Sequence, residues 1–501
     1  MTEKTAAPLY EAVVKYAESG CSAWHTPGHK MGLGADSRLK TLITERGLRG
    51  EVSLADELDD PFAPAGAIAL AQQAAARYFG ARETVFSVSG TTGAIHMMIL
   101  ASLAPGDIVL VSRGVHRSVM GGLVLAGAVP VYIEPEYDEE AELVLNITPE
   151  AVQAAVKKYP TAKALLLVSP NYYGIAADLI RIADILHRAG MLLLVDEAHG
   201  AHLSGLRKPR EKNAGGRAGI PQPATQSGAD LVAQSTHKLL GSLTQTSMLH
   251  IGAEAPYDMA ERVYRAYGIT QTTSPDYLLL ASLDIARAQL EEQGELALSR
   301  VCELTGELRQ KVEALPGLSV YSLPENWQKN FTQDTLKLAV DVSRLGITGP
   351  EAWSYLREKC LMQPELSDAR RVLFIISYAD GEDSLARLYR ALTALSEEYR
   401  NKERKQGTKI PRLPKSPEGV PPMTPRDAYF APAVTMEIDR AVGQTAAEAP
   451  MFYPPGIPVF YPGEIITAEA VEYLQAGLAA GLVPHAEDPT LKTIKIIKGQ
   501  Q

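Results

Sequence analysis

Short segments that are apolar throughout recur along the first half of the chain, separated by segments with helical periodicity. Continuous apolar runs are typical of parallel strands that are covered on both faces. The predicted strands are Glu83–Gly90, Asp107–Ser112, Val129–Glu134, Ala164–Ser169, Leu192–Glu197 and Asp230–Ser235, and predicted helices include Ala67–Gly80, Thr92–Ala104 and Asp178–Gly190. This alternation predicts a doubly wound α/β domain with a mainly parallel sheet, and a ligand at the carboxyl ends of its strands.

The second half of the chain predicts smaller modules. A helical connector at about residues 275–315 leads into an α+β pattern, with strands at Thr335–Ser343 and Arg371–Ala379 and helices at Gly349–Cys360 and Asp383–Arg400. Residues 401–425 are rich in Lys, Arg and Pro and cannot form a core. The expected parts are an arm (1–50), a large domain (51–325), a small α+β domain (326–400), a linker (401–425) and a C-terminal module (426–501).

Composition and charge narrow the function classes. The 501 residues are 46% hydrophobic and 22% charged, which is typical of a globular protein, and the net charge of -10 argues against a nucleic-acid surface. Cys21, Cys302 and Cys360 lack the spacing of a metal site or a redox pair. The amino terminus lacks the apolar core of a signal peptide, and no run is apolar for the length of a membrane span. We therefore expect a cytoplasmic protein that binds neither a metal nor a membrane.

Two motifs at predicted strand ends are suited to binding charged groups. The turn Ser89-Gly90-Thr91-Thr92-Gly93 enters a helix, so free backbone N–H groups, the helix dipole and two hydroxyls would form a phosphate site. Asp196 ends the strand in "LLLVDEAHGAH", where it would stay ionised beside a buried cation such as a protonated ring nitrogen. Each motif also has an ordinary structural explanation as a helix start or a helix cap.

Two further motifs suggest covalent and stacking chemistry. Lys238 lies in "STHKLLG", directly after a predicted strand and beside hydroxyls and His237, as expected for a lysine that forms a Schiff base with an aldehyde. His116 lies in a turn after another strand, where its imidazole would lie flat on an aromatic ring. A single lysine or histidine is usually just solvated. Together, however, the four motifs supply what pyridoxal 5'-phosphate (PLP) requires of a protein.

Seven segments then carry a resemblance to a known family. They are "HTPGHK" at residues 25–30, "SGTTGA", "VDEAHGAH", "QSTHKLLGSLTQTSMLH", "TTSPDY", "TPRDAYFA" and "YPPGIPVFYPGE". In this order they resemble the ornithine/lysine/arginine decarboxylases, which are PLP enzymes of the fold-type-I transferase class, and the likeness runs from about residue 8 to residue 485. The resemblance implies a PLP-dependent decarboxylase with a large α/β domain and smaller α+β C-terminal domains.

The resemblance also implies roles for individual residues. Lys238 would hold the cofactor covalently, Asp196 would pair with the ring nitrogen, and His116 would stack on the ring. His199 would lie beside the cofactor, and its phosphate would be bound by Thr91, Thr92, Ser235 and His237. Residues Thr272, Thr273 and Ser274 resemble a segment that enters the neighbouring subunit's site, which implies a homodimer or a multiple of dimers with shared active sites.

The substrate is expected to be a basic amino acid. The chain resembles short family members without an N-terminal response-regulator-like domain, and these favour arginine, converted to agmatine and carbon dioxide for polyamine synthesis; lysine or ornithine is the alternative. Candidate carboxylates for the distal cation are Glu365, Asp368 and Glu464, although each also fits an exposed or capping role. A longer and more basic segment than expected, residues 206–228, is interpreted as a surface loop near the site mouth.

Other functions remain open at this point. Within the same fold an aminotransferase, an aldolase or a desulfurase would use the same cofactor. An aminotransferase usually has an arginine for the substrate carboxylate, and Arg370 or Arg371 fits that pattern; the three scattered cysteines give a desulfurase little support. A catalytically silent regulatory relative is disfavoured by the intact Lys238, Asp196 and His116.

Overall fold

The chain is described by a computed structural model that covers residues 5–53, 55–206, 220–401, 411–417, 419–453 and 455–499. Most of the basic segment 206–228, and residues 402–410 and 418 of the linker 401–425, therefore lie outside the described residues. The described residues form two compact units, each built from separate stretches of the chain. The first unit takes its residues from 5–102, 194–206 and 222–296, and the second from 103–193, 220–221 and 297–499.

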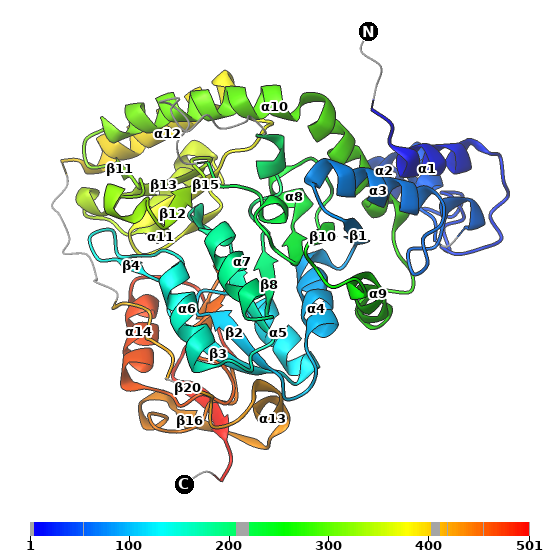
Figure 1. Cartoon of the computed structure of the whole chain (residues 1–501). Helices are drawn as coiled ribbons and strands as arrows, with labels where there is room; N and C mark the ends of the chain where they lie inside the picture. The colour runs from blue at the N-terminus through cyan, green and yellow to red at the C-terminus, as the bar shows by residue number, and fades with distance from the viewer. Residues whose placement is uncertain are drawn as a thin grey trace. The chain divides into compact units, whose positions relative to one another are not determined.

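The strands of the large sheet follow the order β1-β10-β9-β8-β6-β2-β3 (Figure 1). Strand β10 is antiparallel to both β1 and β9, whereas β8 with β9, β2 with β6 and β2 with β3 are parallel. The predicted doubly wound α/β fold with a mainly parallel sheet is confirmed. The strands are Glu83–Ser87 (β1), Ile108–Ser112 (β2), Val129–Ile133 (β3), Ala164–Val168 (β6), Leu192–Asp196 (β8), Leu231–Gln234 (β9) and Ser247–Ile251 (β10).

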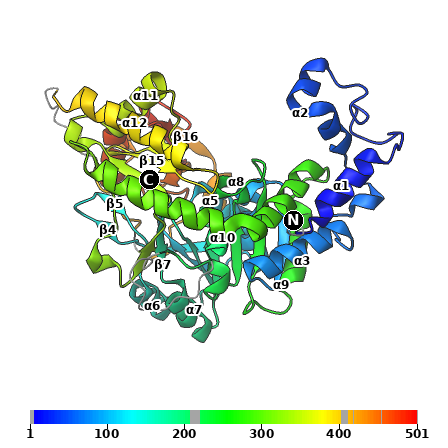
Figure 2. The same ribbon diagram turned by 90° about the horizontal axis from the view of Figure 1, so that it is seen from above.

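Helices account for much of the first unit. The long helix α10, seen from above in Figure 2, begins in this unit, which includes residues up to Leu296. It confirms the predicted helical connector. The helices are Pro8–Glu18 (α1), Ser37–Gly50 (α2), Ala67–Phe79 (α3), Gly90–Ser102 (α4), Thr236–Leu239 (α8), Met259–Thr270 (α9) and Tyr277–Glu313 (α10), with single 3-10 turns at Asp56–Leu58 (η1), Leu203–Gly205 (η2) and Ala224–Gln226 (η3).

The second unit contains three of the large sheet's strands and several smaller modules. A four-stranded sheet has the order β11-β13-β15-β14, and further antiparallel pairs are β12 with β7, β16 with β20 and β4 with β5, while β17 lies between β18 and β19. The strands are Tyr137–Asp138 (β4), Leu143–Val144 (β5), Ile175–Ala177 (β7), Ser319–Val320 (β11), Phe331–Gln333 (β12), Lys337–Asp341 (β13), Leu366–Ser367 (β14), Arg371–Ile375 (β15), Ala433–Glu437 (β16), Met451–Phe452 (β17), Ile457–Pro458 (β18), Pro484–His485 (β19) and Thr493–Ile497 (β20).

Most helices of the second unit begin behind a residue whose side chain caps them. Helix α11 has a capping box, in which Thr348 and Glu351 each accept a hydrogen bond from the other's backbone N–H. Helix α7 starts behind Asp178, whose side chain accepts from the Arg181 N–H. The helices are Arg117–Ala126 (α5), Pro149–Lys158 (α6), Leu179–Arg188 (α7), Gly349–Cys360 (α11), Glu382–Tyr399 (α12), Pro425–Phe430 (α13) and Ala468–Ala479 (α14), with 3-10 turns Glu325–Trp327 (η4), Ser343–Leu345 (η5) and Ile438–Arg440 (η6).

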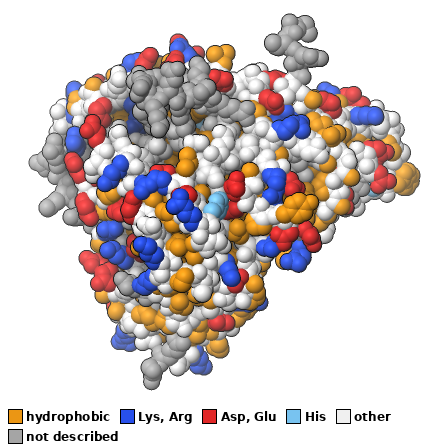
Figure 3. Space-filling model, in the orientation of Figure 1, with side chains coloured by type: hydrophobic (Ala, Val, Ile, Leu, Met, Phe, Trp, Pro, Cys, Tyr) orange, Lys and Arg blue, Asp and Glu red, His pale blue; other side chains and the backbone are white. Residues whose placement is uncertain are grey.

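In the large sheet, the six predicted strands agree with observed ones, and only β10 was not predicted; most short strands of the second unit were not predicted either. All five residues of β10 are buried, including the polar Ser247 and His250. These polar residues interrupt the apolar run that identifies the other strands. On the face shown in Figure 3, Lys and Arg side chains are interspersed with Asp and Glu. Among the described residues, no helix is long and apolar enough to cross a bilayer.

Candidate active site

The turn between β1 and α4 has the backbone of an anion site. Gly90 has a φ of +65°, a conformation that L residues with side chains rarely adopt, and its N–H donates to the Gln245 carbonyl over 2.8 Å. A Cβ on Gly93 would lie 2.6 Å from Ser89 Cβ and 2.8 Å from Gln271 Nε2. The sequence therefore needs glycine at both positions for this tight entry into the helix.

A chain of hydroxyl groups starts at this turn. Thr91 Oγ1 lies 2.5 Å from Ser235 Oγ and donates to Ser247 Oγ over 3.1 Å, and Ser247 Oγ in turn donates to the Gln234 carbonyl over 2.8 Å. Thr91, Ser235 and Ser247 are buried, whereas Thr92 in the next position is exposed. The structure thus brings the predicted phosphate residues Thr91 and Ser235 into direct contact.

Lys238 lies on the single helical turn α8, directly behind strand β9. Its Nζ is 3.0 Å from Nε2 of His199, a side chain that is only 2% exposed. His237, next to Lys238, donates from Nδ1 to the Thr246 carbonyl over 2.6 Å. Burial, and then the positive charge of Lys238, lower the pKa of His237, although its bond to Thr246 opposes this shift. His237 is therefore a neutral imidazole with its hydrogen on Nδ1.

Asp196 is a buried acid at the carboxyl end of β8. It is 3% exposed, and its Oδ1 accepts a hydrogen bond from the Ala198 N–H over 3.1 Å. Burial raises the pKa of Asp196, while the positive charge of Lys238 and the Ala198 bond lower it. No arginine pairs with Asp196 among the described residues. A cationic ligand group would relieve the cost of burying its charge.

Residues 272–274 link α9 to α10. Helix α9 ends at Thr270, Gln271 is buried, and the three residues that follow are exposed. One local hydrogen bond, from the Ser274 N–H to Thr272 Oγ1 over 3.1 Å, shapes this connection. Exposure leaves these hydroxyls accessible to another molecule, and the role predicted for them in a neighbouring subunit stays a prediction.

His116 belongs to the second unit, where it caps helix α5. Its Nδ1 accepts from the Ser118 N–H over 3.2 Å and lies 2.9 Å from Ser118 Oγ, so the ring hydrogen is on Nε2. A Cβ on Gly456 would lie 3.4 Å from Cδ2 of His116, and the Gly456 carbonyl accepts from the Arg117 N–H. The C-terminal module therefore packs against this imidazole, whose stacking on a cofactor stays a prediction.

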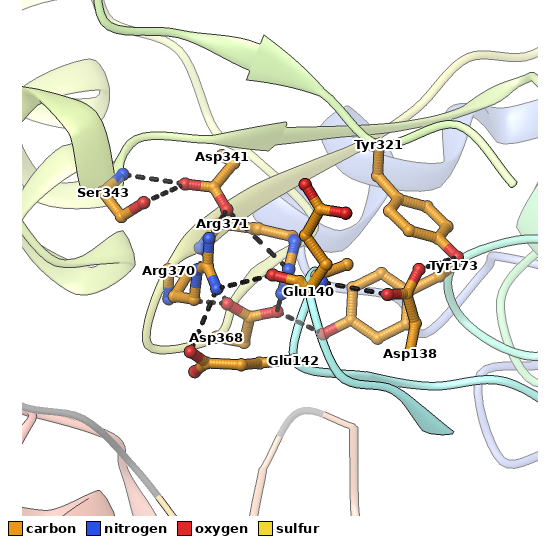
Figure 4. A network of polar contacts seen from close by, with 11 residues as sticks. Asp138, Glu140, Glu142, Tyr173, Tyr321, Asp341, Ser343, Asp368, Arg370 and Arg371 are labelled. Atoms are coloured by element: carbon orange, nitrogen blue, oxygen red, sulfur yellow. Dashed lines mark hydrogen bonds and ion pairs between the residues drawn. The ribbon is translucent and has the colours of Figure 1, made fainter. Parts of the chain in front are cut away.

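The candidate substrate carboxylate Asp368 belongs to a network of polar contacts in the second unit (Figure 4). Its Oδ2 accepts from the Tyr173 hydroxyl over 2.6 Å and from Arg371 Nη1 over 3.3 Å, while its Oδ1 accepts two backbone N–H groups. Arg370 pairs with Asp341 over 3.0 Å and with Glu142 over 3.2 Å. The charge of Asp368 is therefore already balanced, and Arg370 and Arg371 are occupied by carboxylates of their own unit.

The other two candidate carboxylates differ in their surroundings. Glu464 is 3% exposed and lies 3.9 Å from Nη2 of Arg113, which is itself buried and packs against the stacked rings of Tyr132 and Tyr461. Glu464 also accepts from the Tyr461 N–H over 2.8 Å. Glu365 is exposed, and its backbone N–H donates to the Leu373 carbonyl. The three carboxylates therefore differ in exposure and in pairing.

Two buried residues next to the predicted site were not singled out from the sequence. Ser247 completes the hydroxyl chain described above, and Glu197 follows Asp196 directly and is fully buried. Both lie inside motifs quoted from the sequence, but hydroxyls and carboxylates at such positions are usually exposed. Pattern alone therefore gave no reason to select them.

The fold defines the class first. A solved structure titled as the Francisella novicida lysine decarboxylase LdcF superposes with a TM-score of 0.82 at 21% identity, covering 98% of this chain and 81% of that one. At this identity the match shows the fold, which is the large α/β domain with smaller C-terminal modules seen in decarboxylases.

Sequence comparison then gives the family. Residues 7–338 match the family described as "Orn/Lys/Arg decarboxylase, major domain", and residues 415–481 match its C-terminal domain. An arginine decarboxylase of Bacillus subtilis is 39% identical over 99% of this chain and 98% of its own length. The lysine decarboxylase LdcA of Pseudomonas aeruginosa is 29% identical over 57% of this chain and 40% of its own length. The chain belongs to the Orn/Lys/Arg decarboxylase family.

Proposed function

We propose that the protein decarboxylates a basic amino acid with pyridoxal 5'-phosphate as cofactor, and that its substrate is L-arginine, which yields agmatine and carbon dioxide. The observation that carries this proposal is the cluster in the first unit, where Lys238 Nζ lies 3.0 Å from His199 beside the buried acid Asp196. Membership of the decarboxylase family and the full-length likeness to an arginine decarboxylase support the same reaction.

The residues present fit this cofactor. Its phosphate requires hydroxyl and N–H donors at a helix start, which the turn before α4 supplies with Thr91 and Ser235. Its protonated ring nitrogen requires an anion, and Asp196 is a buried acid without an arginine partner among the described residues. Its aldehyde requires an amine, which Lys238 provides. These three requirements are met within one compact unit.

Each of these residues has a defined task in the proposed reaction. When bound, the cofactor supplies an electron sink for the bond that breaks at the α-carbon. Asp196 holds the hydrogen on the ring nitrogen, because a carboxylate stabilises that positive charge in a buried place. Lys238 Nζ accepts or delivers a proton close to the reacting carbon, and His199 orients this amine through their 3.0 Å contact. His237, Thr92 and His116 complete the proposed cofactor contacts.

Arginine is favoured over lysine because the similarity to the Bacillus arginine decarboxylase covers almost the whole of both chains. The group that recognises the distal cation of the substrate is less defined. Asp368 and Glu464 are each balanced by an arginine of the second unit, whereas Glu365 is exposed and forms no ion pair within the described residues. Glu365 is therefore the best supported of the three candidates. We place the reaction in the cytoplasm, where agmatine would serve polyamine synthesis.

A product assay tests this proposal. The purified enzyme with added PLP is given arginine, lysine or ornithine, and the amines agmatine, cadaverine and putrescine are separated and quantified. We expect agmatine to form with the highest kcat/KM. A preference for cadaverine or putrescine would reassign the substrate, and cofactor binding without carbon dioxide release from any of the three would overturn the decarboxylase assignment.

We also propose that the active unit is a homodimer in which residues 272–274 complete the neighbour's site. The exposed hydroxyls of this segment support the idea, because they are available to another subunit. In a heterodimer of Lys238→Ala with a variant disrupted at 272–274, one site would carry both lesions and the other neither. Activity should therefore reappear after subunit exchange. Inactive heterodimers would show that the segment serves its own subunit.

A further inference from the structure

Glu197 is a carboxyl group without an arginine or lysine partner in the described part of the chain, and it is completely buried. Its Oε1 accepts a hydrogen bond from the Ala224 N–H over 2.8 Å, and its Oε2 accepts one from Nε2 of Gln234 over 2.7 Å. A Cβ on Gly200 would come within 2.5 Å of Glu197 Cγ, so glycine is needed there for the side chain to fit. Both carboxyl oxygens are thus fixed in direction.

The contacts continue from Gln234 across neighbouring strands. Gln234 Oε1 lies 3.0 Å from Nε2 of His250 on β10, and His250 Nδ1 lies 2.8 Å from Thr84 Oγ1 on β1. Gln234, His250 and Thr84 are at most 3% exposed. We call these four side chains, Glu197, Gln234, His250 and Thr84, the relay. It links the residue after β8 to β9, β10 and β1 without an intervening surface group.

The relay has two internally consistent directions of hydrogen bonding. In the arrangement of the structure, Gln234 donates to Glu197, so Gln234 Oε1 accepts from Nε2–H of His250 and Nδ1 of His250 accepts from Thr84. If the Glu197 carboxyl is protonated, its hydroxyl has to donate, and Gln234 offers the acceptor once its amide turns over. Gln234 then donates to Nε2 of His250, and Nδ1–H of His250 donates to Thr84.

Reversal of the relay costs no hydrogen bond between its members. The number of bonds between its members is the same in both directions, because each group can act as donor or acceptor. What changes is the charge of one carboxyl and the position of the ring hydrogen of His250. Loss of the Glu197 proton moves that hydrogen from Nδ1 to Nε2, and the released proton goes to solvent. The tautomer of His250 therefore reports the state of Glu197.

Burial and the charges around the relay favour ionisation of Glu197 within an experimentally accessible pH range. The pKa of Glu197 is raised to about 8, because burial, with a smaller contribution from the charge of Asp196, outweighs the lowering by the bonds from Gln234 and Ala224. Burial also lowers the pKa of His250 to about 3, so this ring stays neutral. From the helix side, His250 faces the ring of Phe79 at 4.9 Å. Glu197 is thus the relay member that gains or loses charge.

We propose that Glu197 is a positioning residue whose protonation sets the direction of the relay and, through Asp196, the strength with which the protein holds the cofactor ring. Two connections carry the effect. Glu197 is the chain neighbour of Asp196, so an ionised Glu197 adds a second negative charge close to the proposed ring contact. In addition, the Gln234 carbonyl anchors the hydroxyl chain of Ser247 and Thr91. The effect on the cofactor rests on the proposed function, whereas the relay itself does not.

The first experiment follows the tautomer of His250 in the protein without cofactor. Histidine is labelled with ¹⁵N, and the His250 signals are assigned by their loss in His250→Gln. We expect the hydrogen to lie on Nδ1 below the pH range around 8 and on Nε2 above it. In Glu197→Gln, which can only donate to Gln234 while it accepts from Ala224, the hydrogen should stay on Nδ1 throughout. A wild-type tautomer that does not change, or a change that persists in Glu197→Gln, would overturn the relay.

Two matched variants of Thr84, at the far end of the relay, test the proposal independently in case the Glu197 variant misfolds. Thr84→Ser keeps the hydroxyl and should keep the pH of the tautomer change, whereas Thr84→Val removes it and should shift this pH by about half a unit or more. A network that serves only to hold the fold would give equal midpoints in the two variants. Equal midpoints would therefore count against the proposal.

The second experiment measures cofactor affinity by fluorescence titration of Glu197→Gln and the wild type. Below pH about 7 both carry a neutral group, and their dissociation constants for PLP should agree within about two-fold. Above pH about 9 only the wild type has the additional negative charge, and the variant should bind about three-fold more weakly or worse. A ratio that does not change with pH would refute the coupling to Asp196. Failure of the wild type to bind PLP would instead overturn the proposed function. The relay itself would then still be tested by the tautomer measurement, which needs no cofactor.

Discussion

Two groups of buried acids, one in each unit, differ in how their charge is balanced. In the first unit, Asp196 and Glu197 follow one another at a strand end, and neither has a guanidinium partner among the described residues. In the second unit, Arg371 is 2% exposed, bonds to Asp368 over 3.3 Å and lies 3.8 Å from Asp341 (Figure 4). Burial accordingly raises the pKa of Asp196 and of Glu197.

This difference separates a site from a structural network. A buried charge is costly unless it is paired, so a protein that leaves an acid unpaired beside a lysine keeps a place for a cation from outside. The arginine network of the second unit is complete in itself and needs no ligand to balance it. We therefore expect changes at Asp196 and Lys238 to affect chemistry, and changes in the arginine network of the second unit to affect stability.

The largest effect is expected for Lys238→Ala. Removal of the amine leaves no group to bind the aldehyde covalently, so turnover should fall to the uncatalysed background while the fold persists. Borohydride reduction followed by mass spectrometry checks this, because the wild type should retain the mass of the cofactor on the peptide that contains Lys238. Cofactor mass that stays covalently attached to Lys238→Ala after reduction would remove this lysine from its proposed role.

Asp196→Asn is expected to have the next largest effect. The amide has nearly the same shape but no charge to hold the hydrogen on the ring nitrogen, so kcat should fall by about 100-fold or more while the cofactor still binds. Single-turnover kinetics at saturating PLP separate this loss from weaker binding. Turnover equal to that of the wild type would show that Asp196 does not face the ring nitrogen.

Arg371→Met tests the other part of the comparison, the arginine network of the second unit. The change leaves Asp368 and Asp341 without their buried partner, so the free energy of unfolding should fall by about 3 kcal/mol. Arg370→Met is the matched control: its side chain is 28% exposed, and the loss should be about 1 kcal/mol. Urea unfolding measures both. Equal losses, or a large change in PLP affinity with Arg371→Met, would contradict the division between site and network.

Much of the fold could be predicted because burial on both faces of a sheet imposes continuous apolar runs, as in Ala164–Val168. Part of the candidate site could be proposed from the sequence for a related reason. The parallel strands β8 and β9 end at the same edge of the sheet. Asp196 and Lys238 therefore lie close together, although 42 positions separate residue 196 from residue 238 in the sequence. Local pattern and topology were sufficient in these cases.

The remaining features depend on partners that no local pattern indicates. Arg113 balances Glu464 from about 350 positions away, so Glu464 seemed available in the sequence. Strand β10 escaped prediction because its buried Ser247 and His250 are polar and find partners on other strands. Glu197 was missed since its partners, Gln234 and Ala224, come from distant positions. Long-range polar pairing is therefore what sequence reasoning could not supply.

The smallest expected effect concerns the pH dependence of stability at Glu197. Burial raises the pKa of this carboxyl to about 8 in the folded protein, from an ordinary value of 4.5. Between these values the folded chain keeps a proton that the unfolded chain has lost, so the free energy of unfolding falls as pH rises. This pH dependence ends above about pH 8, where both states are ionised.

Glu197→Gln has no proton to lose. Relative to the wild type it should therefore gain about 2 kcal/mol between pH 6 and pH 8, measured by urea unfolding of the cofactor-free protein at fixed concentration. Glu261→Gln, an exposed carboxylate on α9, serves as the control and should leave the slope as it is. Parallel curves for Glu197→Gln and the wild type would mean that the folded protein holds Glu197 ionised, and the contrast between the two units would then rest on Asp196 alone.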